Sequence, residues 1–352
     1  MKLQHYINNI EKINEEVVCD IQNRLDNLTK PLGSLGKLEE IVKRLGGILN
    51  TSIPKVDKRT IVIMCADNGV TDEGVSSCPK SVTATVTKNF LKGITGINVF
   101  SKHTSSDITV VDIGVDDDIQ CSDIINRKIR KGTSNMLKGP AMTREEAEKA
   151  ILIGIEIVKD LKEKGYNLLG TGEMGIGNTT TSSAVAAVLT SSEVEKMVGV
   201  GSGLSKAAYK NKIDVIKKSI ELNKPDCKDP IDVLSKVGGF DIAGLVGVYL
   251  GSAYYKIPVV IDGFISATAA LVAIKINPIA KDYIFPSHSS AEPGSKKIME
   301  ALGFEPTLNL DMRLGEGTGA ALFFNIIDMA VNAYVEMGTF NDANIEPYKP
   351  LN

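Results

Sequence analysis

The sequence predicts an α/β fold in which a mostly parallel, open sheet is flanked by helices. Short apolar runs rich in β-branched residues recur along the chain, do not alternate with polar residues, and end in turns rich in glycine, aspartate and serine. Such runs are typical of strands that are covered on both faces, as in parallel sheets. Segments with helical patterns separate these runs, and strands that alternate with helices indicate an α/β architecture.

The order of the elements places the functional site at one edge of this sheet. Strands are expected at residues 61–65, 108–113, 167–169, 258–261 and 283–285. The helices expected among them span roughly 80–102, 143–164, 179–190, 204–222, 264–275 and 294–302. A Rossmann-like sheet of this kind binds its ligands at the carboxyl ends of the strands. The polar and glycine-rich clusters of the sequence fall at those ends, so we expect the site there.

The beginning of the chain is predicted to be helical. Apolar residues between positions 38 and 49 recur at the spacing of one helix face, which favours an amphipathic helix. Ser34 is the expected N-cap of this helix. The pair Gly46-Gly47 lies inside the pattern and weakens the prediction at that end.

The length of 352 residues suggests two domains, or one large domain with an accessory part. A long apolar helix is expected at 320–337. We therefore expect a small helical lobe made of residues 1–55 and 325–352. Residues 56–324 would form the α/β domain for substrate binding and catalysis.

The charge balance and the hydropathy pattern exclude several classes of function. Forty basic and 43 acidic side chains leave a net charge of −3, so no basic field exists to hold a nucleic acid. The apolar stretches are far shorter than the roughly 20 residues of a membrane span. The polar N-terminus lacks the apolar core of a signal peptide. We expect a cytoplasmic protein that binds neither nucleic acid nor membranes.

The metal-binding residue types are scattered. Five cysteines occur without a CxxC pair, which is typical of reduced thiols in a reducing compartment. The three histidines are not at helical spacing from one another, which argues against a zinc site. We expect no metal and no bound cofactor.

Residues 170–175 match the pattern GxGxxG between a predicted strand and a predicted helix. This pattern suggests a dinucleotide turn, and with it a nicotinamide-dependent oxidoreductase. Three features argue against that interpretation. The loop continues through 176–181, Glu173 places a negative charge where a pyrophosphate would lie, and the acidic residues about 20 positions further on lie in a polar segment. A loop that handles a smaller ligand is favoured, and a purely structural turn is the alternative.

Two further loops carry groups that suit a phosphate or a ribose. The glycine-rich segment 199–203 precedes several lysines, and backbone N–H groups with a nearby lysine hold a phosphate monoester, although lysines on a helix also form ordinary solvated faces. Segment 286–292 follows a strand and supplies serine hydroxyls. His288 in this segment is interpreted as structural, and no hydrolase triad is visible.

The segment 313–319 contains a glutamate between glycines, Glu316, at the entry to an apolar helix. A carboxylate in such a position is near a positive helix dipole and in partly dry surroundings. It has little structural purpose there, because a solvent-facing glutamate needs no flanking glycines. Glu316 is therefore a candidate general base.

Several segments in order along the chain resemble those of one family, the nicotinate-nucleotide–dimethylbenzimidazole phosphoribosyltransferases of cobalamin nucleotide-loop assembly. The resemblance covers nearly the whole chain. The segments that carry it are LTKPLGSLGKLE (28–39), ADNGVTDEGVS (66–76), RKGTSNM (130–136), GTGEMGIGNTTTSSA (170–184), VGSGLS (200–205), VGGFDIAGL (237–245), IDGFISATAAL (261–271), SHSSAEPG (287–294) and DMRLGEGTGAAL (311–322).

The resemblance implies a reaction. Ribose 5-phosphate moves from nicotinate mononucleotide to a ring nitrogen of 5,6-dimethylbenzimidazole, and the products are α-ribazole 5′-phosphate and nicotinate. The anomeric carbon inverts from β to α. The leaving group is a cationic pyridinium that becomes neutral as it departs, so no magnesium is needed to neutralise a pyrophosphate. The attacking base loses a proton from its second nitrogen, which a poised carboxylate can remove.

The resemblance also implies roles for individual residues and a homodimeric state. Glu316 takes the role of the general base, and Glu173 is a second catalytic carboxylate near the ribose or the leaving group. The residues implied in substrate binding are Ser76, Ser77, Thr85, Met174, Gly175, Gly201, Ser202, Lys212, Asp262, Gly263, Ser290, Arg313, Leu314 and Gly315.

Two positions depart from the family pattern. Asn68 stands where the family usually has a histidine, and Thr85 stands where many members have a longer glutamine. A shorter Thr85 would leave a gap beside the base and widen base choice, or it would merely bond within its own helix. The competing classes of function are the oxidoreductase and a non-catalytic nucleotide sensor.

Overall fold

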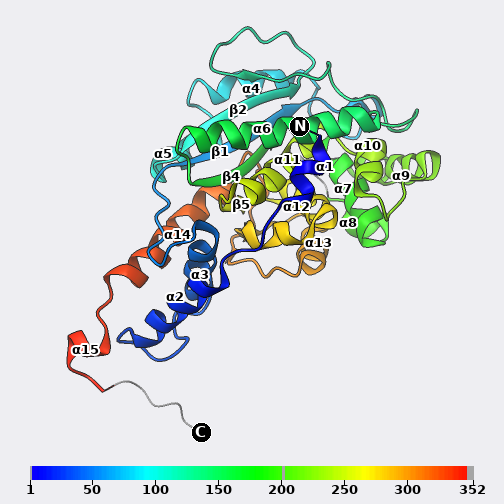
Figure 1. Cartoon of the computed structure of the whole chain (residues 1–352). Helices are drawn as coiled ribbons and strands as arrows, with labels where there is room; N and C mark the ends of the chain where they lie inside the picture. Colours follow the sequence, from blue (N-terminus) through cyan, green and yellow to red (C-terminus); the bar gives the residue numbers. More distant parts are fainter. Residues whose placement is uncertain (1, 200–202, 347–352) are drawn as a thin grey trace.

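The computed structural model describes residues 2–199 and 203–346. Its core is a sheet of six parallel strands in the order β3-β2-β1-β4-β5-β6, with helices around it (Figure 1). This is the strand order of the Rossmann fold, so the predicted fold class is confirmed. The strands are β1 (Arg59–Ala66), β2 (Asp107–Gly114), β3 (Ile125–Asn126), β4 (Leu168–Met174), β5 (Val259–Ile261) and β6 (Ile284–Pro286), and a small second sheet pairs β7 (His288–Ser289) with β8 (Leu308–Asn309).

Helices surround the sheet and build the rest of the fold. Those before β4 are α1 (Leu3–Asn8), α2 (Glu15–Asn27), α3 (Lys37–Leu49), α4 (Val82–Phe90), α5 (Gly96–His103) and α6 (Arg144–Glu163). Those after β4 are α7 (Asn178–Thr190), α8 (Val194–Met197), α9 (Lys206–Asn223), α10 (Pro230–Val237), α11 (Phe240–Tyr255), α12 (Phe264–Ile276), α13 (Ser295–Leu302), α14 (Thr318–Glu336) and α15 (Phe340–Ala343). Two short 3-10 turns lie at Gly69–Glu73 and Pro278–Tyr283.

Adjacent residues of β4 show which helices cover the two faces of the sheet. The hydroxyl groups of Thr171 and Tyr249, from α11, lie 2.8 Å apart. A Cβ atom at the preceding residue, Gly170, would instead lie 3.0 Å from Ala320 and 3.2 Å from Phe324, both in α14. Successive side chains of a strand point to opposite faces, so α11 covers one face and α14 the other. This explains why the strands are apolar without alternation.

The helix α11 has no counterpart among the expected elements. Its residues from Phe240 to Ala253 are all buried, so its sequence carries no polar face and no amphipathic period. The helix α6 packs over it so closely that a Cβ atom at Gly154 would lie 2.1 Å from the carbonyl oxygen of Gly244. Because a helix that is buried on all sides has no polar face, its sequence does not show the pattern of an amphipathic helix.

Other expected boundaries also need correction. The helix expected at 80–102 is two helices, because Thr95 begins α5 with a reciprocal capping box to Asn98. The expected cap Ser34 lies in a turn, and α3 begins at Lys37 after Gly36. The Gly46-Gly47 pair lies inside α3 and does not end it. A Cβ atom at Gly46 would lie 2.0 Å from Ile21, so the missing side chain allows α2 to pack closely against α3.

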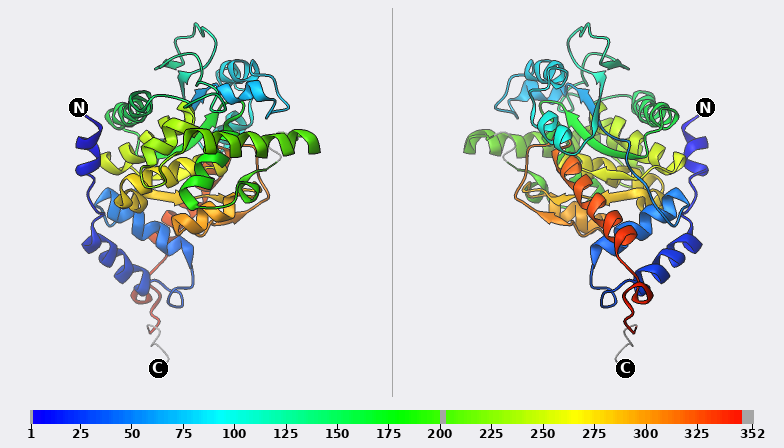
Figure 2. Two further views of the ribbon diagram at one scale, coloured as in Figure 1. Left: turned by 90° about the vertical axis from the view of Figure 1, so that its right-hand side faces the viewer. Right: turned by 90° about the vertical axis from the view of Figure 1, so that its left-hand side faces the viewer.

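The N-terminal helices and the end of α14 lie side by side (Figure 2). Arg24 in α2 donates to the carbonyl oxygen of Tyr334 in α14 at 3.3 Å, and Leu28 pairs with Thr339 in an antiparallel bridge. In contrast, α1 contacts α11 and α6, which belong to the sheet region. The division into a lobe of 1–55 with 325–352 and a domain of 56–324 stays a prediction.

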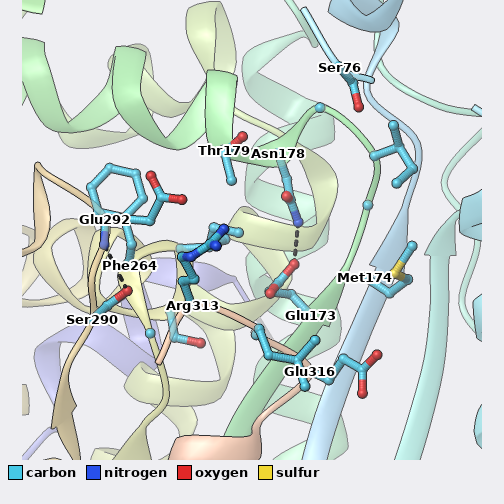
Figure 3. Close-up of a pocket in the computed structure, with 18 of the residues that line it drawn as sticks. Ser76, Glu173, Met174, Asn178, Thr179, Phe264, Ser290, Glu292, Arg313 and Glu316 are labelled. Atoms are coloured by element: carbon cyan, nitrogen blue, oxygen red, sulfur yellow. Dashed lines mark hydrogen bonds between the residues drawn. The ribbon is translucent and has the colours of Figure 1, made fainter. Parts of the chain in front are cut away.

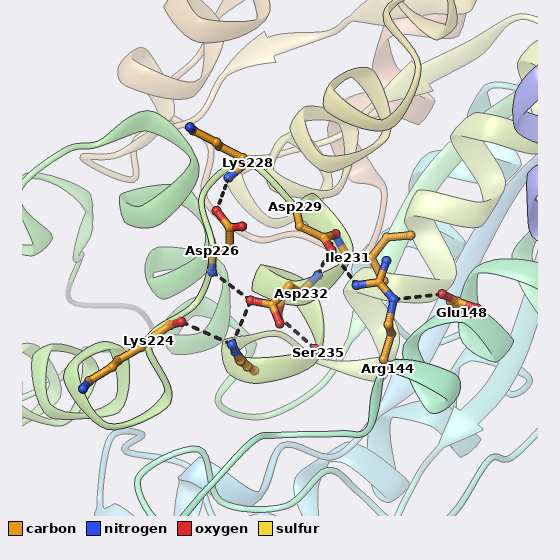
Figure 4. Close-up of polar contacts among 10 residues, drawn as sticks. Arg144, Glu148, Lys224, Asp226, Lys228, Asp229, Ile231, Asp232 and Ser235 are labelled. Carbon is orange, nitrogen blue, oxygen red and sulfur yellow. Dashed lines mark hydrogen bonds and ion pairs between the residues drawn. The ribbon is translucent and has the colours of Figure 1, made fainter.

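The helices α6 and α10 are joined by a capping residue and its ion pair. Asp229 accepts hydrogen bonds from the backbone N–H groups of Ile231 and Asp232, both at 3.1 Å, and so caps α10. Its other carboxylate oxygen lies 2.6 Å from Arg144 at the start of α6 (Figure 4). This network ties α10 to α6 and is remote from the cavity described below.

Among the described residues, α14 is the one helix long and apolar enough, by length and composition, to cross a membrane. Half of its most apolar window is buried inside the fold, and it contacts α3, α5, β4 and β5. These are the contacts of a core helix. All five cysteines are unpaired.

Candidate active site

A cavity of about 440 Å³ lies at the carboxyl ends of the central strands (Figure 3). Its walls come from the turn between β4 and α7, the start of α12, the segment after β6 and the loop before α14. The residues predicted from the sequence that line it are Ser76, Glu173, Met174, Gly175, Gly263, Ser290, Arg313, Leu314, Gly315 and Glu316. The sequence therefore located the edge of the sheet correctly, and distant segments meet there.

Other predicted residues lie behind the cavity or away from it. Lys212 and Asp262 are buried but do not line it, and neither do Ser77 and Thr85. The predicted residues Gly201 and Ser202 lie outside the described residues. Their proposed contacts with the nucleotide stay predictions.

Glu173 is a buried carboxylate in β4, just before the strand ends. Its Oε2 atom accepts a hydrogen bond from the side-chain amide of Asn178, at the start of α7 (Figure 3). Burial and, to a smaller extent, the nearby carboxylates of Asp241 and Asp262 raise the pKa of Glu173 to about 8. A carboxylate of this kind changes protonation near neutral pH.

The first two glycines of the GxGxxG pattern allow other parts of the chain to pack closely against β4. Gly170 and Gly172 lie within β4, which runs on to Met174, so the strand expected to end at 169 is longer. A Cβ atom at Gly172 would lie 2.5 Å from the carbonyl oxygen of Glu316. The interpretation of 170–175 as a dinucleotide turn is therefore wrong, because its first two glycines are strand residues. Gly170 packs against side chains of α14, and Gly172 packs against the backbone of the loop that carries Glu316.

Glu316 lies in this approaching loop and has a left-handed backbone conformation, with φ of +62°. Its Oε2 atom accepts a hydrogen bond from the backbone N–H of Ile97, 3.0 Å away, in the first turn of α5. The expectation that Glu316 has little structural purpose is wrong, because its carboxylate satisfies a free N–H group of α5. The positive helix end beside it belongs to α5 and not only to α14.

Two opposing effects act on the protonation of Glu316. Burial raises its pKa above the ordinary range, whereas hydrogen bonds from the backbone of Ile97 and Gly96 lower it. Burial is the larger effect. The carboxylates of Glu316 and Glu173 both lie at the cavity wall and point in different directions (Figure 3).

Asp262 fixes the loop that carries Glu316. Its Oδ2 atom accepts from the backbone N–H of Gly317 at 2.9 Å, and its Oδ1 atom accepts from that of Gly319 at 2.7 Å. These are the N–H groups at the start of α14 that would otherwise lack partners. Asp262 therefore acts as a remote cap of α14, from a strand end 55 residues earlier in the chain.

The positively charged side chains of Lys212 and Arg313 lie on one side of the site. The ammonium group of Lys212 is buried and donates to the hydroxyl of Thr179 at 2.9 Å, and burial lowers its pKa to about 8. Arg313 is exposed at the cavity, and among the described residues its guanidinium has no hydrogen bond or ion pair. Burial raises the pKa of Glu292 beside them, while Lys212 and Arg313 lower it.

The start of α12 offers unsatisfied donors to the cavity. No side chain caps this helix, and Gly263, Phe264 and Ser266 all line the wall. The hydroxyl of Ser266 is buried and has no hydrogen-bond partner among the described residues. An uncapped helix N-terminus with a free hydroxyl is suited to bind an anion.

The polar residues of the wall that sequence reasoning missed include Asn178, Ser266 and Glu292. The first two stand in the first turns of helices that follow a strand end, within the segments GNTT and DGFIS. Their position in the first turn of a helix after a strand end is the sequence feature that could have identified them. Glu292 ends the polar segment 286–292, which was singled out for its serine hydroxyls and not for this glutamate.

The residues expected to line the base pocket divide into two groups. Ser76 lines the cavity, and its hydroxyl accepts a hydrogen bond from the backbone N–H of Cys78 at 3.2 Å. Thr85 is exposed, and its hydroxyl donates to the carbonyl oxygen of Ser81 at 3.1 Å within α4. The threonine of α4 nearest the β4–α7 turn is Thr83, which accepts from the N–H of Ile176, a residue of the cavity wall.

Thr85 therefore does not line the cavity, and the alternative that it bonds within its own helix describes its contacts. Asn68, the other departure from the family pattern, is buried at the end of β1. Its side-chain amide donates to the carbonyl oxygen of Ile176 at 3.5 Å, so it supports the same turn from behind.

Comparison with known proteins places these features in a family. Residues 10–345 match the sequence model of a family described as phosphoribosyltransferase. The chain is 66% identical over 351 residues to the nicotinate-nucleotide–dimethylbenzimidazole phosphoribosyltransferase of Clostridium acetobutylicum, and 67% identical over 351 residues to that of Ruminiclostridium cellulolyticum. Each alignment covers 100% of both chains.

A solved structure agrees with this match. The crystal structure of CobT from Thermus thermophilus is 37% identical in sequence, has a TM-score of 0.90, and is similar over 95% of this chain and 100% of that chain. The family resemblance seen in the ordered motifs is thus confirmed. This chain belongs to the phosphoribosyltransferase family that contains the nicotinate-nucleotide–dimethylbenzimidazole phosphoribosyltransferases.

Proposed function

We propose that the protein transfers ribose 5-phosphate from nicotinate mononucleotide to 5,6-dimethylbenzimidazole or a related base, as a step of cobalamin biosynthesis. The observation that carries this proposal is the pair of carboxylates, buried Glu173 and half-buried Glu316, at the wall of one cavity beside an uncapped helix N-terminus. The products are α-ribazole 5′-phosphate and nicotinate. Relatives that share two thirds of this sequence carry the corresponding name.

The phosphate of the nucleotide would lie at the start of α12. The backbone N–H groups there are uncapped, and the hydroxyls of Ser266 and Ser290 are at the same wall. Lys212 and Arg313 supply positive charge on this side of the cavity. A phosphate dianion at a helix N-terminus with a nearby cation is a favourable arrangement.

The acidic side of the cavity suits the rest of the substrate. Nicotinate mononucleotide carries a cationic pyridinium, and positive charge develops on the ribose as the bond to nitrogen breaks. A carboxylate aimed at such charge stabilises the transition state, because it needs no reorganisation at the moment of reaction. Glu173, which is held in position by Asn178, takes this role in its ionised form, whose fraction grows as the pH approaches its pKa of about 8.

Glu316 is the proposed general base. As the benzimidazole nitrogen attacks, the other ring nitrogen becomes acidic and must lose its proton. The burial of Glu316 makes its carboxylate a stronger base than a solvated one, and the N–H of Ile97 keeps it aimed. The two oxygens have separate tasks, because one accepts from α5 and the other is available to the base.

The proposal includes a homodimer in the cytoplasm. The segment from the end of α4 into α5 exposes three large apolar residues, with exposed fractions of 37% for Leu91, 66% for Ile94 and 54% for Val99. A second copy of the chain over this surface would remove them from water. Five unpaired cysteines suit a reducing compartment. Light scattering on the purified protein tests the dimer.

The proposed function is tested by incubation with nicotinate mononucleotide and a panel of benzimidazoles, with products identified by mass. We expect stoichiometric nicotinate and a ribosylated base phosphate, with several benzimidazoles accepted at rates within about two orders of magnitude of one another. Binding without consumption of the nucleotide would indicate a sensor. Because Thr85 does not line the cavity, the Thr85→Gln variant, run beside the wild type, should show the same base choice.

A further inference from the structure

A chain of buried polar groups runs from the cavity wall into the protein. The side-chain amide of Asn178 donates one hydrogen to Glu173 and the other to the Oδ2 atom of Asp241, 3.0 Å away. Asp241 lies in the first turn of α11 and is fully buried. One amide thus joins two carboxylates, of which only Glu173 reaches the cavity.

A second contact lies at the inner end of this chain. The Oδ1 atoms of Asp241 and Asn68 are both buried without a hydrogen-bond partner among the described residues. Each would lie 2.5 Å from a Cβ atom at Gly239, so both oxygens face the same small space. Buried acceptors of this kind are costly, and a functional constraint can explain why they persist.

We propose that Asp241 is a positioning residue that acts through the Asn178 amide to fix the place of the Glu173 carboxylate and to control how readily it ionises. Asp241 itself does not touch the substrate. This inference rests on the proposed function, because it assigns Glu173 to the reacting site. It extends that function by assigning a role to Asp241, the buried aspartate of the segment VGGFDIAGL.

The charges around the pair determine the direction of the effect. Glu173 faces carboxylates from three other segments: Asp241 on α11, Asp262 after β5 and Glu316 before α14. On the side of β1, Asp241 faces Asp67, and the buried thiol of Cys65 lies close to both carboxylates. The groups that act most strongly on Glu173 are thus acidic, and they favour its protonated form.

The pair ionises in sequence. Burial raises the pKa of Asp241 to about 6, with Asn178 opposing the shift, and the pKa of Glu173 is about 8. Asp241 is therefore already charged when Glu173 loses its proton. Its charge opposes that loss, whereas the hydrogen bond from Asn178 assists it.

Two substitutions should move the titration of Glu173 in opposite directions. In Asp241→Asn the opposing charge is gone, so Glu173 should titrate at least about one pH unit lower. The new amide also supplies a hydrogen where Asp241 and Asn68 now present two acceptors, so the variant should fold. In Asn178→Ala the assisting hydrogen bond is gone, so the midpoint should rise.

The matched control is Asp112→Asn. Asp112 is a carboxylate of β2 that is equally buried, but it accepts from the N–H of Val115 and pairs with Lys128 at 3.2 Å. The same loss of a buried charge at a neighbouring strand should leave the midpoint of Glu173 within a few tenths of a pH unit.

The measurement is a ¹³C NMR titration of the full-length protein with labelled glutamate carboxyl groups, in which Glu173→Gln identifies the resonance. The pH profile of kcat/KM for nicotinate mononucleotide is recorded beside it and should shift in the same direction. An unmoved midpoint in Asp241→Asn, or equal shifts in both variants, would overturn the proposal. If Asp241→Asn does not fold, Asp241→Ser, which removes the same charge, takes its place, and an unmoved midpoint in that variant would equally overturn the proposal.

The NMR titration needs no turnover, so the two proposals fail separately. A wild-type protein that makes no ribosylated base contradicts the proposed function, whatever the titration gives. Active wild-type protein with an unmoved midpoint contradicts only the role of Asp241.

Discussion

The carboxylate of Glu316 accepts a hydrogen bond from the backbone N–H of Ile97, at 3.0 Å, although 219 positions separate the two residues. The contact joins the loop before α14 to the first turn of α5. On its other side the same loop is held by Asp262, which accepts from the N–H groups of Gly317 and Gly319. The proposed general base is thus fixed from two directions by backbone donors and a carboxylate cap.

Replacing Glu316 with glutamine should keep the fold and nucleotide binding but lower kcat by about 10²–10⁴-fold, as expected for loss of a general base. The glutamine carbonyl can still accept from Ile97, so α5 keeps its cap. Calorimetry of nicotinate mononucleotide binding and steady-state kinetics provide the test. Glu336→Gln, on the exposed end of α14, is the control. Near-normal turnover with full binding would remove Glu316 from the mechanism.

Asp262→Asn should lower both stability and kcat. The asparagine can accept from only one of the two N–H groups that Asp262 now satisfies, so one buried donor loses its partner at a cost of about 1–3 kcal/mol. The loop that carries Glu316 should then lose its fixed position.

The matched variant is Asp229→Asn, which removes the ion pair between the cap residue of α10 and Arg144, away from the cavity. It should cost stability but leave kcat unchanged. Urea denaturation and kinetics on both variants separate the two effects, and an equal fall in kcat would contradict the positioning role of Asp262.

Stability should depend on pH through Glu173. Its pKa rises from 4.5 to about 8 on folding, because it is buried. Between these values the folded chain binds its proton more tightly than the unfolded chain does. The contribution to the free energy of unfolding is therefore complete below about pH 4.5 and is lost as the pH rises toward 8.

Glu173→Gln should flatten this dependence, since glutamine does not titrate, and Glu336→Gln should not. The comparison needs urea denaturation of the three proteins at several values between pH 5 and pH 8.5. Identical pH dependence in wild type and Glu173→Gln would show that Glu173 is not protonated in the folded protein at neutral pH.

Activity should survive exhaustive chelation with EDTA. The proposed leaving group carries no pyrophosphate, and within 2–199 and 203–346 no group of three or more histidine, cysteine or acidic side chains is placed to hold a metal ion. Rates before and after chelation, and after addition of magnesium, are compared. Loss of turnover that magnesium restores would contradict the proposed chemistry.

The sequence predicted the sheet and its functional edge because both depend on local patterns. Apolar runs ending in polar turns mark each strand end, and parallel strands bring those ends together. It failed for α11, because a helix buried on every side has no period to detect. It also placed Gly170 and Gly172 in a loop, because glycine in a strand and glycine in a turn look alike without the elements that pack against them.

Contacts between residues far apart in the sequence could not be predicted from local patterns either. Glu316 appeared to lack a structural partner because Ile97 stands far away in the sequence. Asp241 carried no functional signal of its own, since the helix that contains it was not predicted and its partner Asn178 lies in another element. Its link to Glu173 depends on Asn178, which only the folded chain brings between them.

The most direct test of the central claim is the configuration of the product made from nicotinate mononucleotide and 5,6-dimethylbenzimidazole. The proposed function requires direct attack on the anomeric carbon from the face opposite the departing pyridinium. Proton NMR of the purified product should therefore show the α anomer, formed in equal amount with free nicotinate. A β anomer, or a nucleotide that stays intact in the presence of base and active protein, would contradict the account.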